Sequence, residues 1–124
     1  MPGTTDRGKR GELLAASYIR TRGYAILESN YKTALGEIDL IAHEGGSTVF
    51  IEVKTRLSSS LGPPYLSVTW KKRRKIIQNA LCYLKQKRLD SIPWRIDIVS
   101  LKLGADGEME SIELFKNAIE DIPR

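Results

Sequence analysis

The fold of this chain is decided by GEIDLIA at residues 36–42 and VFIEVK at residues 49–54, which flank the pair Gly45-Gly46. Both segments are rich in Ile, Val, Leu and Phe with a period of two, which is typical of strands, and two glycines between such segments predict a hairpin. With a tight turn at the glycines, Glu44 faces Ser47, and all facing residue numbers sum to 91. A four-residue loop gives the same sum, so this register does not depend on where the turn begins.

In this register Asp39 faces Glu52 and Glu37 faces Lys54, all on one side of the hairpin. The other side carries apolar residues that must be buried, namely Ile38, Leu40, Ala42, Val49, Ile51 and Val53. A register slip of one residue would send this apolar set to the opposite face, so burial of the set resists such a slip.

The charged face has two interpretations. In the first it is a solvated hairpin surface, and Glu37 with Lys54 is an ordinary cross-strand pair worth roughly 0.2–1 kcal/mol. In the second it is a cation site. Asp39 and Glu52 would have Cβ atoms about 5 Å apart, and their repulsion is about 3 kcal/mol at an effective dielectric constant near 20. Ile41 and Phe50 lie on the same face, so part of it should be covered, and a bound cation would stabilise carboxylates held there.

A third carboxylate is expected to join this pair. Residues 8–22 read as a helix that ends at Gly23, and Glu12 falls on the same arc as its apolar residues Ala15, Ala16, Tyr18 and Ile19. The alternative is that Glu12 is favoured only by the dipole at the helix N-terminus. Because an unpaired buried charge is costly, the sharper interpretation places Glu12 over the hairpin, beside the other carboxylates.

The remaining segments supply a scaffold. The pattern predicts a strand at 24–31, a long helix at 67–87, a strand at 94–101 and an edge strand at 111–115. The order α-β-β-β-α-β-β predicts an α/β fold with a mixed sheet flanked by helices. The chain of 124 residues is expected to form one domain, 1–124, with its core at about 8–101 and an edge strand and C-terminal tail at 102–124.

The charge balance favours a polyanionic partner. Twenty Lys and Arg residues against fifteen Asp and Glu residues give a net charge of +5. The densest basic run opens the long helix: Lys71, Lys72, Arg73, Arg74 and Lys75. A solvated helix start is the alternative, but cations near a helix N-terminus are unfavourable for its dipole, which suggests a function in phosphate contact. Arg56 is expected to extend the positive surface. No stripe of aromatic residues suggests base stacking, so we expect recognition of backbone or shape.

Other residues attract simpler interpretations. His43 is the only histidine, so a zinc site or a histidine base has little support, and Cys82 is the only cysteine, which excludes an internal disulfide. Arg95 and Asp97 share one face of their strand and are expected to pair with each other, the alternative being that Arg95 reaches a phosphate. Trp94 is expected in the core, whereas Trp70 is expected to be exposed or at an interface. Without a signal peptide or transmembrane run, a cytoplasmic location and no membrane partner are expected.

Several motifs together resemble the YraN family of small bacterial proteins. They extend from about Lys9 to Leu101 and comprise Gly11-Glu12 with Ala15, Gly23-Tyr24, Asn30-Tyr31, GEIDLI at 36–41, FIEVKTR at 50–56, Lys72 and RIDIV at 95–99. That family is similar to the archaeal Holliday junction resolvases and to the restriction-endonuclease-like superfamily with its D-(x)n-(D/E)-x-K signature. Ile51 and Ile96 are conservative departures from the family pattern.

The resemblance implies a restriction-endonuclease-like fold and a metal-dependent endonuclease that hydrolyses structured or branched DNA. It implies that Asp39, Glu52 and the Val53 carbonyl hold Mg²⁺ or Mn²⁺, that Lys54 positions the attacking water, and that Glu12 completes the ligand set or binds a second ion. Such ions take oxygen ligands and are commonly held by one or two carboxylates plus a substrate phosphate.

The resemblance also implies that Lys72 contacts DNA and that the protein is a homodimer; no small-molecule cofactor is expected. Glu37 is either a further ligand or, by our preferred interpretation, the partner that fixes Lys54. A second class of function stays open, in which the protein is a non-catalytic nucleic-acid-binding module of the same fold that acts in recombination or repair.

Overall fold

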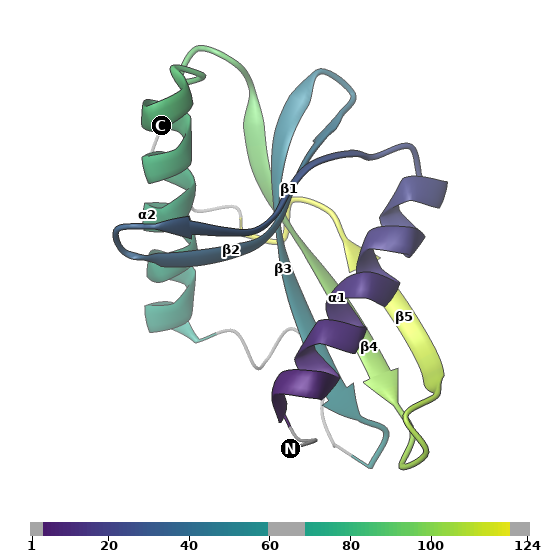
Figure 1. The fold of residues 1–124 in the computed structure, drawn as a ribbon. Helices are drawn as coiled ribbons and strands as arrows, with labels where there is room; N and C mark the ends of the chain where they lie inside the picture. Colours follow the sequence, from purple (N-terminus) through teal and green to yellow (C-terminus); the bar gives the residue numbers. More distant parts are fainter. Residues whose placement is uncertain (1–3, 60–68, 120–124) are drawn as a thin grey trace.

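The computed structural model describes residues 4–59 and 69–119 and shows one mixed sheet with a helix on each side (Figure 1). The elements are α1 (Thr4–Thr21), β1 (Ala25–Thr33), β2 (Gly36–Glu44), β3 (Ser47–Leu57), α2 (Trp70–Lys87), β4 (Trp94–Leu103) and β5 (Met109–Phe115). The predicted α/β class and the order α-β-β-β-α-β-β are therefore confirmed. The predicted helix start at 67 and the end of the tail, 120–124, lie outside the described residues.

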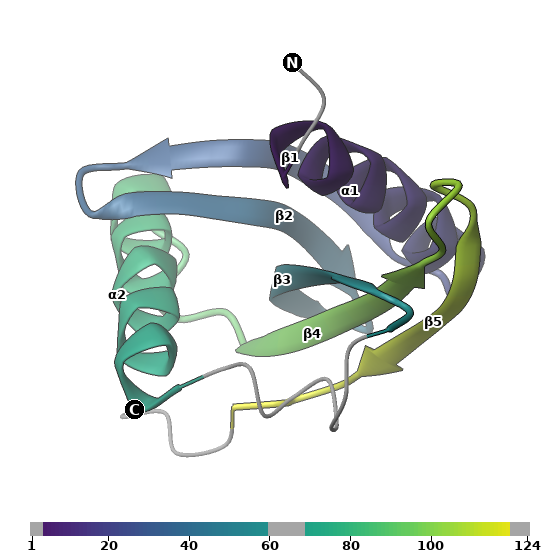
Figure 2. The ribbon, with the colours of Figure 1, turned by 90° about the horizontal axis from the view of Figure 1, so that it is seen from below.

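The strands follow the chain across the sheet, in the order β1-β2-β3-β4-β5. β3 and β4 are parallel and α2 connects them, whereas the other neighbouring pairs are antiparallel. A parallel pair needs a long crossover, and here the crossover helix covers one face of the sheet. Figure 2 shows α1 and α2 on opposite sides, with the β1–β2 hairpin reaching across towards α2.

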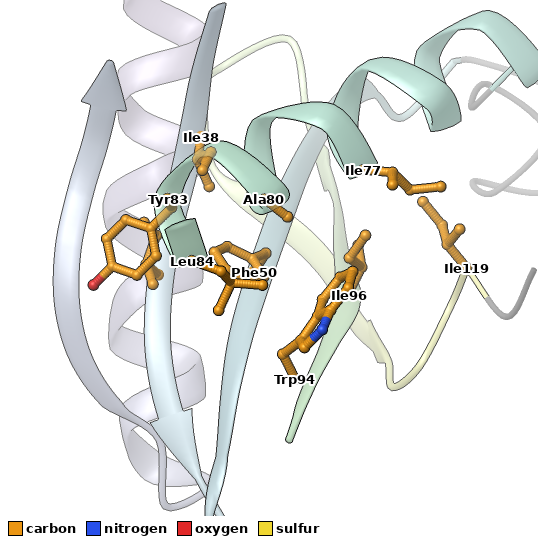
Figure 3. Packing of buried hydrophobic residues seen from close by; sticks show 10 residues of the cluster. Ile38, Phe50, Ile77, Ala80, Tyr83, Leu84, Trp94, Ile96 and Ile119 are labelled. Atoms are coloured by element: carbon orange, nitrogen blue, oxygen red, sulfur yellow. The ribbon is translucent and has the colours of Figure 1, made fainter. Parts of the chain in front are cut away.

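Two apolar clusters fill the space between the sheet and its helices. On the α2 side, Phe50 makes edge-to-face contacts with Tyr83 and Trp94, with ring centroids 5.6 and 5.9 Å apart (Figure 3). On the α1 side the cluster consists of Ala15, Ala16, Ile19, Tyr24, Leu40, Ala42, Val49, Ile51, Val99 and Leu101. Both faces of the central strands are thus buried, which explains why Ile41 and Phe50 are apolar on the face that also carries acids.

The hairpin register is confirmed where the ladder exists. β2 and β3 pair from Glu44–Ser47 to Leu40–Ile51, in the predicted register. Beyond Leu40 the ladder with β3 stops, while β2 stays paired with β1 through Ile38 and Glu37. The two central strands therefore separate at Asp39.

The prediction that Ile38 shares one buried face with Leu40, Ala42, Val49, Ile51 and Val53 is wrong, because that set packs on the α1 side and Ile38 does not. Ile38 is buried in the α2 cluster beside Phe50 and Ala80 (Figure 3). The reason is that the turn between β1 and β2 is held against α2. Thr33 Oγ1 donates a hydrogen bond to Oδ1 of the buried Asn79 at 2.5 Å. Gly36, with φ of 155°, lies close to this contact: a Cβ there would lie 3.2 Å from Asn79 Nδ2, so a side chain at this position would require Asn79 to shift.

α1 packs closely on β3 at Gly11. A Cβ on Gly11 would overlap Thr55 Oγ1 and would lie 3.1 Å from Cβ and 3.2 Å from Cγ2 of the same side chain. Thr55 is β-branched and therefore stiff, so it cannot easily turn aside. The glycine sets the distance between helix and sheet immediately before Glu12.

This contact gives a matched pair of substitutions within one helix. Gly11→Ala should destabilise the protein by about 1–3 kcal/mol, as overpacking does. Gly8→Ala in the same helix, where nothing lies within 4 Å, should stabilise it by up to about 1 kcal/mol through helix propensity. Urea denaturation measures both, and Thr55→Ala should restore part of the loss in Gly11→Ala. Equal effects of the two alanines would contradict the close approach.

Candidate functional site

Asp39 lies where β2 leaves β3. In place of a further ladder bond, the Val53 backbone N–H donates to Asp39 Oδ2 at 2.8 Å. The pKa of Asp39 is raised to about 8. Burial is the largest cause, the charge of the neighbouring Glu52 adds to it, the Val53 hydrogen bond opposes it, and Glu12 makes a smaller contribution in the raising direction. The predicted proximity of Asp39 and Glu52 is therefore present, as a carboxyl pair that resists carrying two negative charges.

Lys54 is next to this pair, but its partner differs from the predicted one. Lys54 Nζ lies 3.3 Å from Glu52 Oε2, with about a fifth of each side chain exposed. The preferred interpretation, in which Glu37 fixes Lys54, is wrong, because the β2–β3 ladder ends before it reaches these residues. Glu37 is exposed; its charge raises the pKa of Glu12, and it lines a small depression together with Glu52.

Glu12 is half-buried on α1, as its place on the apolar arc predicts. Burial raises its pKa, the Asn30 side chain hydrogen-bonds it and opposes that rise, and the charges of Glu37 and Glu52 add to it. Glu12 therefore shares an electrostatic environment with the hairpin acids. Asn30 has a φ of 51°, a left-handed conformation that asparagine tolerates better than most residues. The sequence pattern contained Asn30 without indicating its contact with Glu12.

The donor set is suited to one oxygen-seeking cation, but it is not a complete cage. Within residues 4–59 and 69–119, no group of three or more His, Cys, Asp and Glu side chains is close enough to hold a metal ion. Asp39 and Glu52 form a carboxylate pair, and Mg²⁺ commonly needs only one or two carboxylates because it keeps waters and takes a substrate phosphate. The pair therefore fits Mg²⁺ or Mn²⁺, and Glu12 stands outside a preformed three-carboxylate set.

The basic run forms the first turns of α2. Thr69 caps the helix by accepting a hydrogen bond from the Lys72 backbone N–H at 3.2 Å. Of the five basic residues only Arg73 is half-buried, and the others are exposed. The methylene Cε of Lys75 would lie 3.5 Å from a Cβ on Gly36, so this end of the run reaches the strand that carries the acids. Arg56 is half-buried on β3, two residues after Lys54.

A separate polar network surrounds Asp97, on the α1 side of the sheet. This fully buried carboxylate accepts hydrogen bonds from Tyr24 Oη at 2.7 Å, Arg95 Nε at 3.0 Å and the Asn117 backbone N–H at 2.8 Å. Arg95 also pairs with Glu44 at 2.7 Å. The predicted structural pairing of Arg95 with Asp97 is confirmed, and the sequence did not reveal the contributions of Tyr24 and Glu44.

The remaining single residues lie as expected. His43 is exposed, Cys82 is a half-buried free thiol, Trp94 is in the core, and Trp70 is 64% exposed. Neither α1 nor α2, as far as the structure describes them, is long and apolar enough to cross a membrane.

Comparisons with known proteins agree with the motifs around these residues. Residues 11–101 match the model of the uncharacterised protein family UPF0102, which is the YraN family. A UPF0102 protein of Syntrophus aciditrophicus is 47% identical over 113 residues, covering 91% of this chain and 87% of the relative. One of Geobacter metallireducens is 45% identical over 114 residues, covering 91% of each protein. A third, of Geotalea uraniireducens, is 43% identical over 113 residues, covering 91% and 88%. The chain therefore belongs to the UPF0102 family.

Proposed function

We propose that this protein is a metal-dependent endonuclease that hydrolyses phosphodiester bonds in structured or branched DNA. The observation that carries the proposal is the pair Asp39–Glu52 at the separation of β2 from β3, where burial and mutual repulsion raise the pKa of Asp39 to about 8. Holding two carboxylates together in this way is unfavourable without compensation, and a divalent cation is the compensation that their chemistry selects.

The residues around the pair suit phosphodiester hydrolysis. Asp39, Glu52 and the Val53 carbonyl would hold the ion. When bound, Mg²⁺ supplies an activated water and stabilises the leaving oxygen. Lys54 Nζ lies 3.3 Å from Glu52 Oε2, so a phosphate held beside that carboxylate is within reach of its ammonium group. There Lys54 would orient the attacking water and stabilise the charge that develops on phosphorus.

Glu12 and the basic residues serve substrate and ion binding in this account. Glu12 would complete the ligand set through a bridging water, or it would bind a second ion. Lys71–Lys75 and Arg56 would contact phosphates, which position a nucleic acid without reading its sequence. A homodimer that presents two such sites, and a cytoplasmic location, stay predictions.

A second candidate is a nucleic-acid-binding module without catalysis. It is favoured by one observation, that no three-ligand metal group is preformed in the described part of the chain. Both candidates predict that the basic residues contact phosphates. Only the endonuclease also needs Lys54 for a chemical step.

The deciding experiment incubates the protein with supercoiled, single-stranded, flap and four-way-junction DNA and either Mg²⁺ or Mn²⁺. Wild type should cleave at least one substrate, Glu52→Gln should not, and Lys54→Ala should be slower by roughly 10²–10³-fold, the cost of one transition-state charge contact. Lys116→Ala is the matched control, because Lys116 is 54% exposed and pairs with Glu44 on the other network.

Cleavage that survives in Glu52→Gln at the wild-type rate would indicate a contaminating nuclease. Wild type that binds all four substrates yet cleaves none with either metal would replace the endonuclease with the binding module.

A further inference from the structure

Trp70 is a large aromatic side chain that the core does not use. It is the first residue of α2 and is 64% exposed, whereas Trp94 is 9% exposed within the α2 cluster. An exposed tryptophan on its own needs no explanation. Its surroundings, however, are unusual in both shape and charge.

The indole lies at a depression of about 470 Å³ on the surface of α2. The described residues that line it are Trp70, Lys71, Arg74, Lys75 and Gln78. These positions recur at helical spacing, so they form one face of the helix. We refer to these five residues as the Trp70 face.

The charge of α2 is one-sided. The helix WKKRRKIIQNALCYLKQK contains seven Lys and Arg residues and no Asp or Glu. Within the described residues no carboxylate forms a salt bridge with Lys71, Arg74 or Lys75. Cations repel one another at helical spacing and oppose the dipole at a helix N-terminus, so this arrangement costs stability until an anionic partner binds.

We propose that the Trp70 face binds nucleic acid through an unpaired base, with the indole stacked on the base and Lys71, Arg74 and Lys75 on the adjoining phosphates. Stacking on an aromatic side chain combined with a basic groove is how single strands are held without sequence preference. The bases of an intact duplex already stack on one another, and the carboxylates of an acidic peptide or the phosphate of a lipid headgroup offer no aromatic face beside the negative charge. Of these ligands, only a single strand can use both the exposed indole and the cations of the Trp70 face.

This inference rests on the proposed function and narrows its substrate class to DNA with unpaired nucleotides. The sequence led us to expect recognition of the backbone or shape only, and base stacking at Trp70 is added to it. The same helix reaches the acids on its other side, where Ile76 and Asn79 line a depression with Glu37 and Glu52, and Lys75 of the Trp70 face approaches Gly36 at the start of β2. From Trp70 to Asn79 the helix rises about 14 Å, so a strand bound on the face would have to continue past Lys75 to reach the carboxylate pair.

Binding can be measured without cleavage, in the presence of a chelator. A labelled oligothymidylate single strand and its duplex with oligoadenylate are titrated with the full chain, and fluorescence anisotropy gives each affinity. Trp70→Ala should weaken single-strand binding by roughly 10- to 100-fold and duplex binding by less than about 3-fold, since a duplex presents only phosphates to the face. Trp70→Phe should keep most of the affinity, and single strands should quench the tryptophan fluorescence.

Leu81→Ala is the matched control, because it truncates another exposed apolar residue of α2, 43% exposed, and should change neither affinity. Arg74→Gln should weaken the binding of both ligands. It should also reduce the slope of log affinity against log salt concentration by about one unit. Circular dichroism verifies that each variant is folded.

Equal losses on single strand and duplex in Trp70→Ala, or no loss on either, would overturn the proposal. So would polyglutamate or anionic vesicles that bind as tightly as the oligonucleotide and with the same dependence on Trp70. Failure of the nuclease proposal is distinguishable, because it would leave single-strand stacking intact while no DNA is cleaved with metal present.

Discussion

Asp39→Asn is expected to abolish metal-dependent cleavage. Removal of a single charge-stabilising contact from an active site costs about 10²–10³-fold in rate. Asp39 would do more than one contact does, because its carboxylate would hold the ion that both activates water and stabilises the leaving oxygen. We therefore expect a loss of at least about 10³-fold in single-turnover cleavage. Asp90→Asn, an exposed aspartate in the turn after α2, should cleave like wild type.

The same substitution should have the opposite effect on stability without metal. The folded state raises the pKa of Asp39 from 3.8 to about 8, so between these values the folded protein binds more protons than the unfolded chain. Stability must then fall as pH rises through this window. Asparagine mimics the protonated acid, so Asp39→Asn should be more stable than wild type at about pH 8 and similar to it near pH 4.

One pKa unit corresponds to about 1.4 kcal/mol, and we expect a gain of at least that size at the upper pH, measured by urea denaturation in a chelator. In wild type, protons and metal compete for Asp39, so cleavage should also increase from about pH 6 to pH 8. A metal-free Asp39→Asn that is less stable than wild type at pH 8 would contradict the account of this carboxylate.

Asp97→Ala is expected to cause the largest loss of stability. Asp97 is fully buried and accepts hydrogen bonds from Tyr24, Arg95 and the Asn117 backbone. Its removal leaves the Arg95 guanidinium, whose side chain is only 18% exposed, without its buried partner. Breaking a buried ion pair in this way costs roughly 3–5 kcal/mol.

Asp97→Asn separates the parts of this network. It retains an acceptor for the Asn117 N–H but loses the negative charge, so its cost should lie between zero and that of alanine. Because the hydrogen bonds of Asp97 go to Tyr24, Arg95 and Asn117 and not to the proposed ion ligands, Asp97→Asn should still bind Mn²⁺ if folded. A loss below about 1 kcal/mol in Asp97→Ala would mean that Glu44 alone stabilises Arg95, through the pair at 2.7 Å.

The sequence predicted the central part of the site because that part depends on short-range regularities. A two-residue period and a glycine turn fix which residues face each other near the turn, and the ladder has this register from Glu44–Ser47 to Leu40–Ile51. The helical period likewise placed Glu12 on the buried side of α1. Both rules hold for a few residues on either side of a fixed point. Asp39 and Glu52 come directly after the last ladder pair, and they are still close enough for Glu52 to raise the pKa of Asp39.

The predictions failed where distant contacts take over. The positions of Glu37 and Ile38 depend on the neighbouring β1–β2 turn. That turn is held on α2 by the hydrogen bond between Thr33 and Asn79, which are 46 residues apart in the chain. No periodicity in β2 could reveal that contact. The overlap that a side chain at Gly11 would cause with Thr55 likewise exists only after α1 has packed on the sheet.

The exposure of Trp70 shows a related limit. The sequence predicted that Trp70 is exposed or at an interface, but it left open which residues surround the indole. The structure places it outside, in a basic depression. The function of that surface therefore depends on tertiary structure even though every residue in it belongs to one helix.

The central claim is that Asp39 and Glu52 form a binding site for a divalent cation, and isothermal titration of Mn²⁺ into the metal-free protein at about pH 8 tests it most directly. The account predicts saturable binding to wild type, loss of that binding in Asp39→Asn and in Glu52→Gln, and unchanged binding in Asp90→Asn. Equal Mn²⁺ binding by all four proteins, or none by wild type, would contradict it.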